Sequence, residues 1–318
     1  MKKRLQWIDI GKGIGICLMY YGHIGCPDII LRLIYAFHMP LFFFLSGYVL
    51  SVDIPIKKFI KKKLSGLIKP FLIFGTFVIL GNFIISLLLN TKYDLFDNLY
   101  YLFVQQIGTS ARLWFIPCLF VSSLICYYIL NMNHGMIYYI VLSIIAWLNV
   151  YYFNIRIPWY IDIAIICSFF MLLGFRVKDL KCELYLNLMH LFFLTIFFVI
   201  LTIINSFFGV VDVAQNFYAN PILFYVNAIL GIIITINIAM RVKNKIIEYI
   251  GYNSLLFMFL NSMSIKMMLI IVNIVNITFF DIQIKNIFIL IGSIIFVYVI
   301  SLITKKYFFR LIKIIGFA

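Results

Sequence analysis

Long apolar runs constrain this chain more than any other feature of its sequence. A helix needs roughly 20 apolar residues to cross the hydrocarbon core of a bilayer. With 65% hydrophobic and only 12% charged residues, the chain lies far below the roughly 25% charged residues of a soluble domain. We therefore predict an all-α polytopic membrane helical bundle. About ten transmembrane helices are expected, at residues 6–24, 29–51, 70–90, 112–131, 136–153, 157–175, 187–210, 221–240, 249–273 and 286–304.

The basic residues predict the orientation of these helices. If the N-terminus is cytoplasmic, the inside segments hold nineteen of the 26 Lys and Arg residues, as expected when positive charge stays inside. Ten spans then place both termini in the cytoplasm, N-in and C-in, and we expect a multi-pass protein of the cell (plasma) membrane. The first apolar run continues past signal-peptide length without a small-residue cleavage site, so we expect it to stay in the mature protein. No linker divides the chain, which predicts a single transmembrane domain, 1–318, with no appended soluble domain.

Charge and cysteine content exclude other classes of protein. The net charge of +15 is explained by positive-inside loops, so no nucleic-acid partner is expected. The six cysteines include no C-x-x-C pair and no His/Cys pairing at zinc spacing. Neither a disulfide framework nor a metal site is predicted.

The first expected helix carries polar groups that are costly in lipid. Lys12 and His23 are eleven residues apart, which returns to within about 20° of one direction and separates them by roughly 16 Å along the axis. Asp9 precedes Lys12 by one turn, close enough to pair with it and reduce its burial cost. This arrangement favours a functional site. A simpler interpretation is that Lys12 snorkels to the interface and His23 is a hydrogen-bonded core residue.

The segment Lys57–Lys69 places six lysines between apolar residues. It is typical of an amphipathic helix on the cytoplasmic face, where it would bind anionic lipid. The same ammonium groups would also attract a polyanionic donor such as coenzyme A. The sequence leaves both interpretations open.

Further polar or helix-breaking residues lie inside apolar segments. Pro40 is expected to kink the second span directly after His38, and an ionisable group beside a kink indicates a cavity. The alternative interpretation is that His38 is only a packing residue. Trp114 near the start of the fourth span serves equally as an interface anchor or a binding residue. Asp162 and Lys266 each require a partner or water, which the sequence does not identify.

Three blocks of this sequence resemble the acyltransferase 3 family of integral membrane O-acyltransferases. They are Ile8–Ile14 together with Gly22–His23, then Phe37–Tyr48, then Leu113–Pro117, in the order and spacing of that family. Within it, the chain is most similar to the branch of fucose 4-O-acetylase-like proteins and other surface-polysaccharide O-acetyltransferases. The family's ten-span topology covers essentially the whole chain.

The resemblance implies transfer of an acetyl (acyl) group from cytoplasmic acetyl-CoA to a hydroxyl of a glycan or lipid-linked sugar. Lys12 and His23 match the family's basic-x10-His motif, which implies a donor-side cation and a general base. His38 matches a second block and implies positioning or substrate contact, with His23 and His38 together as the catalytic residues. Lys63 matches the first basic residue of a donor-side pair. Asp9, Ser46 and Trp114 are expected to support the pocket.

Two positions depart from the family pattern. Gly66 stands where a second basic residue is expected, which puts the donor contacts there in doubt. Asn261 stands where the family block commonly leads into a histidine, so no catalytic role is assigned to it. No metal is implied.

Two other classes of function compete with an acyltransferase. A polysaccharide exporter or flippase is also polytopic, basic and rich in aromatic residues, but it has no need for a proton acceptor three turns from a cation. An envelope scaffold gives no reason to keep His23, His38 and Lys12 in apolar segments.

Overall fold

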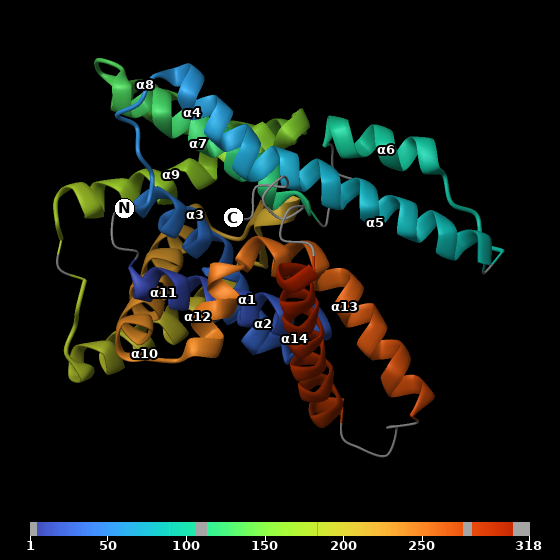
Figure 1. Ribbon diagram of the computed structural model, residues 1–318. Coiled ribbons are helices and arrows are strands. Elements are labelled where there is room, and N and C mark those ends of the chain that lie inside the picture. Colours follow the sequence, from blue (N-terminus) through green and yellow to red (C-terminus); the bar gives the residue numbers. More distant parts are fainter. Residues whose placement is uncertain (1–4, 89, 106–112, 183, 276–281, 308–318) are drawn as a thin grey trace. The chain divides into compact units, whose positions relative to one another are not determined.

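The computed structural model describes residues 5–88, 90–105, 113–182, 184–275 and 282–307. They form an almost entirely helical chain, labelled in Figure 1, with two short strands. The helices of the first half are α1 Gln6–Ile24, α2 Asp28–Tyr35, α3 His38–Tyr48, α4 Ile56–Lys63, α5 Lys69–Leu88, α6 Leu95–Val104, α7 Phe115–Asn131 and α8 Gly135–Leu148. The second half has α9 Ile161–Asp179, α10 Leu188–Ser206, β1 Val211–Asp212, β2 Phe217–Tyr218, α11 Pro221–Arg241, α12 Lys245–Tyr252, α13 Ser254–Ile274 and α14 Ile282–Tyr307. Both predicted cytoplasmic termini lie outside the described residues.

Eight helices of the described chain are long and apolar enough to cross a membrane. They correspond to eight of the ten expected segments. The other two form helices as well: 112–131 gives α7, which has 17 residues, and 6–24 gives α1, whose polar residues and glycines lower its mean hydropathy. The all-α polytopic bundle is confirmed, whereas the count of ten and the orientation stay predictions.

Asparagine and aspartate side chains start several of these helices. The side chain of Asn187 accepts from His190 N at 2.8 Å, Asn220 from Leu223 N at 3.1 Å, and Asn244 from Ile246 N at 2.9 Å. Each bond satisfies a backbone donor that a helix start leaves unpaired. These caps explain why the apolar runs begin as helices at the residues they do.

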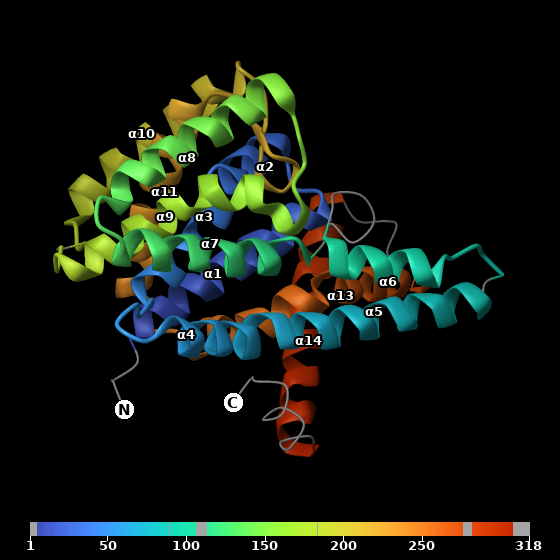
Figure 2. The ribbon, with the colours of Figure 1, turned by 90° about the horizontal axis from the view of Figure 1, so that it is seen from above.

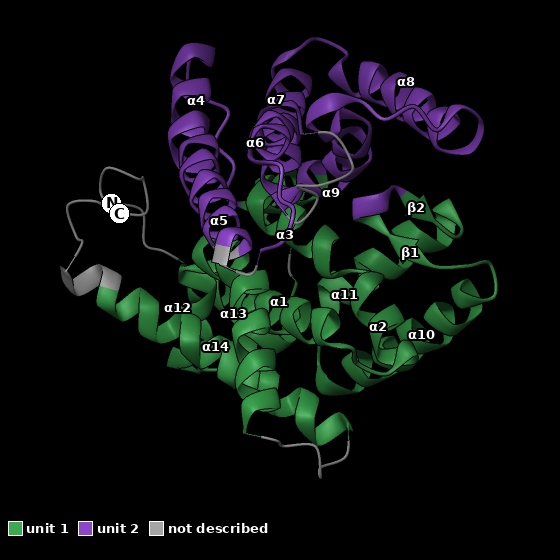
Figure 3. Ribbon diagram, turned by 90° about the vertical axis from the view of Figure 1, so that its right-hand side faces the viewer, with its two compact units in different colours: residues 1–48, 173–213, 217–307 green, residues 49–172, 214–216, 308–318 purple. Residues whose placement is uncertain are grey.

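The described residues divide into two compact units (Figure 3). The first comprises the parts of 1–48, 173–213 and 217–307 that are described, and the second those of 49–172 and 214–216. Each unit takes segments that are distant in sequence, so neither is a contiguous stretch of chain. The single domain, 1–318, stays a prediction.

In the first unit, α1 is the central element. It contacts α2, α3, α11, α12, α13 and α14. The glycines of α1 permit this, since Gly11, Gly13 and Gly15 are all buried and glycine lets helix backbones approach closely in a bilayer. A left-handed Gly25, with φ of 98°, ends the helix in the conformation that glycine adopts most easily. Helix α1 therefore lies inside a bundle of helices.

The second expected span is interrupted earlier than Pro40. Helix α2 ends at Tyr35 and α3 begins at His38, so the break lies just before His38 rather than after it. Pro40 cannot donate to the carbonyl of Ala36, which removes the bond that would join the two helices. Inside the first turn of α3 the missing N–H costs little.

In the second unit, the lysine-rich segment is helical as predicted but is not separate from the following span. A π-helical turn, Leu64–Ile68, joins α4 to α5 without a break, and Figure 2 shows the two as one rod with α6 beside α5. Lys57, Lys58, Lys61 and Lys62 are exposed and Phe59 is buried. The amphipathic pattern is therefore present in the structure.

Candidate active site

Helix α1 carries three of the expected site residues without a break. Asp9 is buried, Lys12 is half-buried, and His23 is exposed in the last turn. Because the helix is continuous, Lys12 and His23 share one face about three turns apart. The geometry that the sequence predicts for this pair is present.

The start of α1 lies against α12 with the two backbones almost touching. A methyl group on Gly13 would lie 2.9 Å from the carbonyl carbon of Ile247, and one on Gly251 would lie 2.7 Å from Gly13 N. Such distances are too short for any side chain, so only glycine fits at either position. The segment from Asp9 to Gly13 is thus held by backbone contact, which fixes the direction in which Lys12 leaves the helix.

His38 is a buried histidine in a defined tautomer. Its ring is 6% exposed, and Nδ1 lies 2.9 Å from the carbonyl oxygen of Ile34. A carbonyl oxygen only accepts hydrogen bonds, so Nδ1 carries the proton and donates, and Nε2 of the neutral ring holds the lone pair. The ring of Tyr35 packs beside it, with centroids 5.1 Å apart. His38 therefore presents Nε2 as a proton or hydrogen-bond acceptor.

The end of α1 lies beside the break between α2 and α3. A methyl group on Gly22 would lie 3.2 Å from Cε1 of Tyr35, the same ring that packs on His38. The structure thus places the last turn of α1, which carries His23, next to the break that carries His38, with Tyr35 between them.

Ser46 is half-buried on α3, about two turns after His38. A methyl group on Gly174 would lie 2.9 Å from the carbonyl carbon of Phe44 and 3.0 Å from Tyr48 N, so the end of α9 touches the backbone of α3 on both sides of Ser46. Ser46 therefore lies in a tightly packed helix crossing, as its small size predicts.

Lys63 and Trp114 belong to the second unit. The ammonium nitrogen of Lys63 lies 5.5 Å from the ring centre of Phe59, within the range of a cation–π contact. Trp114 is buried, with its ring centroid 6.1 Å from that of Tyr160, so it is a packing residue of this unit rather than an exposed anchor. Gly66 lies in the π-helical turn, where a methyl group would meet nothing within 4 Å.

Three buried amides were not selected from the sequence. In the described part of the chain, Asn205 Oδ1, both amide atoms of Asn227 and Asn261 Nδ2 have no hydrogen-bond partner. Asn227 lies one turn before Gly231, where a methyl group would be 2.7 Å from Cδ1 of Phe37, so it is on the face of α11 directed toward Phe37. An unsatisfied buried polar group costs about 1–3 kcal/mol, which makes these amides candidates for contact with a substrate or water. An isolated asparagine in an apolar run is the signal that would have found them.

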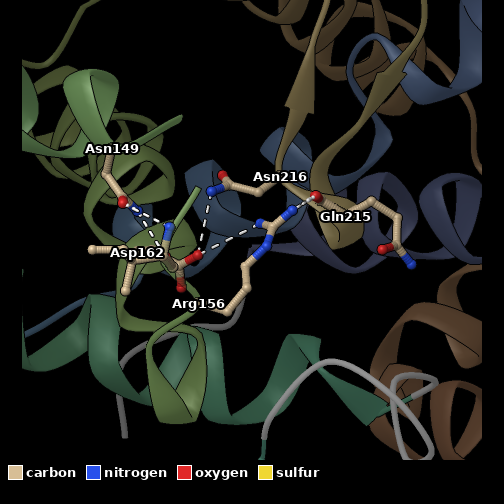
Figure 4. Close-up of polar contacts among 6 residues, drawn as sticks. Asn149, Arg156, Asp162, Gln215 and Asn216 are labelled. Atoms are coloured by element: carbon tan, nitrogen blue, oxygen red, sulfur yellow. Dashed lines mark hydrogen bonds and ion pairs between the residues drawn. The ribbon is translucent and has the colours of Figure 1, made fainter. Parts of the chain in front are cut away.

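Asp162 has partners that the sequence could not identify. Its Oδ2 lies 3.6 Å from Arg156 Nη1 and accepts from Asn216 Nδ2 at 3.2 Å, and Arg156 also donates to the carbonyl of Gln215 (Figure 4). All four residues belong to the second unit. A buried carboxylate paired and hydrogen-bonded in this way is held in place, so we assign Asp162 a structural role. Lys266 is exposed on α13. Among the described residues, no group of three His, Cys, Asp or Glu side chains is placed to hold a metal ion.

A family model covers this whole arrangement. The acyltransferase domain of the acyltransferase 3 family matches residues 5–306, from before α1 into α14. The chain belongs to the acyltransferase 3 family. It is therefore an acyltransferase and, with eight apolar helices in its described residues, a multi-pass membrane protein. No curated protein and no solved structure matches it significantly.

Proposed function

We propose that this acyltransferase moves an acetyl group from cytoplasmic acetyl-CoA to a hydroxyl of a cell-surface polysaccharide or its lipid-linked precursor, in the plasma membrane. The observation that carries the proposal is the placement of two histidines, His23 in the last turn of α1 and His38 at the start of α3, near one tyrosine ring, Tyr35. One member, His38, is buried with Nε2 as its acceptor nitrogen, and the other, His23, lies on the same helix face as Lys12.

The proton goes to His23 in this proposal. His23 accepts the proton of the acceptor hydroxyl while the hydroxyl oxygen forms its bond to the thioester carbon. The C–S bond breaks, and the imidazolium returns the proton to the leaving thiolate. His38 is a positioning residue, because its Nε2 can accept a hydrogen bond from the substrate hydroxyl or from the His23 ring. Fixing a base by a second group in this way is common in acyl transfer.

The basic residues of the chain fit a polyanionic donor. Lys12 supplies a half-buried cation on the face that carries His23, and Lys63 supplies one at the end of α4. The four exposed lysines of α4 add a positive surface, which raises the local concentration of an anionic donor. Asp9 and Ser46 hold the helices of the first unit in place around Lys12 and His38. Trp114 holds the helices of the second unit in place by packing.

Mass spectrometry of surface glycans tests the proposal in cells. We expect acetyl esters in cells that make the protein and none in cells that lack it or carry His23→Ala, with the same glycan backbone at the surface in all three. Loss of the whole glycan from the surface, rather than of its acetyl groups, would indicate an exporter or flippase instead.

A further inference from the structure

A cavity of about 220 Å³ lies in the first unit, between α2, the end of α10 and the segment that leads into β1. Figure 3 shows these three elements side by side. Its polar lining comes from Asp28, Arg32, Tyr35, Thr202, Asn205, Ser206 and Asp212. The cavity is smaller than the 300–1,000 Å³ of sites for drug-sized ligands, so it suits one small ring rather than a longer chain.

The arginine of this cavity is held in place. Arg32 Nε donates to Asp28 Oδ2 at 2.6 Å, and its Nη1 donates to the carbonyl of Gly209 at 3.3 Å. The Arg32 side chain is 28% exposed. A guanidinium bound at two points keeps its remaining N–H groups in a fixed direction, which costs a ligand little ordering.

Asn205 gives the second, independent sign of a ligand. It is only 4% exposed, it lines the cavity, and the described chain offers no hydrogen-bond partner to its Oδ1. The other polar side chains at this end of α10, Thr202 and Ser206, donate to carbonyl groups of their own helix. A buried acceptor without a donor is destabilising, so a rotation of the Asn205 amide that turns its oxygen toward a ligand hydroxyl in the cavity would be favoured.

The cavity also lies one side chain away from the histidines. Tyr35 lines it, and the ring of Tyr35 packs against His38 with centroids 5.1 Å apart. With the predicted N-in orientation, the end of α1, the start of α2 and the end of α10 all lie on the outer side, where a surface glycan or its precursor would be met.

The chemistry of the lining selects the occupant. An aromatic face packs on the C–H side of a sugar ring, while amide, guanidinium and carboxylate groups pair with its hydroxyls. Two carboxylates, Asp28 and Asp212, outnumber the single Arg32, so the cavity disfavours a further negative charge. We propose that this cavity binds one uncharged pyranose unit of the acceptor and excludes a uronate. The inference rests on the proposed function, because it assigns the acceptor side of the same site.

Saturation-transfer NMR on the full-length protein in nanodiscs tests this, with methyl glucopyranoside and methyl glucuronide as probes. The neutral glycoside should bind and the glucuronide should bind at least tenfold more weakly. Asn205→Leu keeps the side-chain volume but removes the amide, and it should lower the affinity for the neutral glycoside about tenfold. Thr195→Val is the matched control on α10, because the Thr195 hydroxyl only bonds its own helix at Leu191, and it should bind as the parent does.

Charge selection is tested separately by Asp212→Asn, which should reduce the discrimination against the glucuronide. Equal binding of both glycosides by the parent, or a neutral-glycoside affinity unchanged in Asn205→Leu, would overturn the inference. Acetyl-CoA binding, measured on the same samples, separates the two proposals. If acetyl-CoA binds and no glycoside does, the cavity assignment fails alone; if a glycoside binds without any acetyl transfer, the proposed function fails and the cavity remains a saccharide site.

Discussion

Replacing Gly13 by alanine tests whether the close contact of α1 and α12 sets the site. The added methyl group would overlap the carbonyl oxygen of Ile247 and lie 2.8 Å from its Cγ2 and 2.9 Å from its carbonyl carbon. The obstructing atoms include backbone, so α12 must retreat from α1 by roughly 1 Å to reach ordinary contact distance, and a 1 Å misplacement can cost about 10²-fold in rate. Overpacking of this kind also costs about 1–3 kcal/mol of stability.

The matched control is Gly81→Ala on α5, where a methyl group would meet nothing within 4 Å. Both variants gain the helix propensity of alanine, about 1 kcal/mol in water, so they differ in the clash alone. Transfer of radiolabelled acetyl from acetyl-CoA to glycan extract measures activity, and fluorescence-detected gel filtration after heating measures stability. Gly13→Ala should lose about 10²-fold in activity and melt at a lower temperature than Gly81→Ala. Equal activity and equal melting temperature in the two variants would show that the contact does not position the site.

Three further predictions concern the catalytic and donor-side residues. His38→Ala should lower acetyl transfer by about 10²-fold, and His38→Gln, which places an amide oxygen near the Nε2 position, should keep more activity; equal rates for the two would remove the hydrogen-bonding role. Lys12→Ala should raise the KM for acetyl-CoA, and Lys12→Arg should raise it less because the charge stays; a KM unchanged by Lys12→Ala would place the donor elsewhere. Joint replacement of the exposed α4 lysines by glutamine should weaken acetyl-CoA binding and its salt dependence while kcat changes little; unchanged binding would leave α4 with a lipid role only.

The sequence predicted the features of this fold that depend on local pattern. Apolar length and composition placed the helices, because both properties belong to the residues of a single segment. The sequence predicted the helix break after His38, whereas it lies before His38. The reason is that Pro40 removes the hydrogen bond to the carbonyl four residues earlier, so the helix is interrupted there rather than at Pro40 itself. The continuous α4–α5 rod was also missed, because a lysine-rich segment is equally typical of a separate surface helix.

Contacts between distant segments were beyond sequence reasoning. His23 and His38 were each selected, but their proximity depends on Gly22 packing against Tyr35. One partner of Asp162, Asn216, comes from a loop more than fifty residues away. Asn205 was not selected although an asparagine in an apolar run is a signal, and only the structure shows that its oxygen has no donor in the described chain.

Acetyl transfer by purified, folded His23→Ala protein tests the central claim most directly. The parent should move labelled acetyl from acetyl-CoA to the glycan, and the variant, eluting as the same folded species, should be slower by about 10²–10⁴-fold. Activity of the variant within a few-fold of the parent would contradict the account and remove His23 from the mechanism.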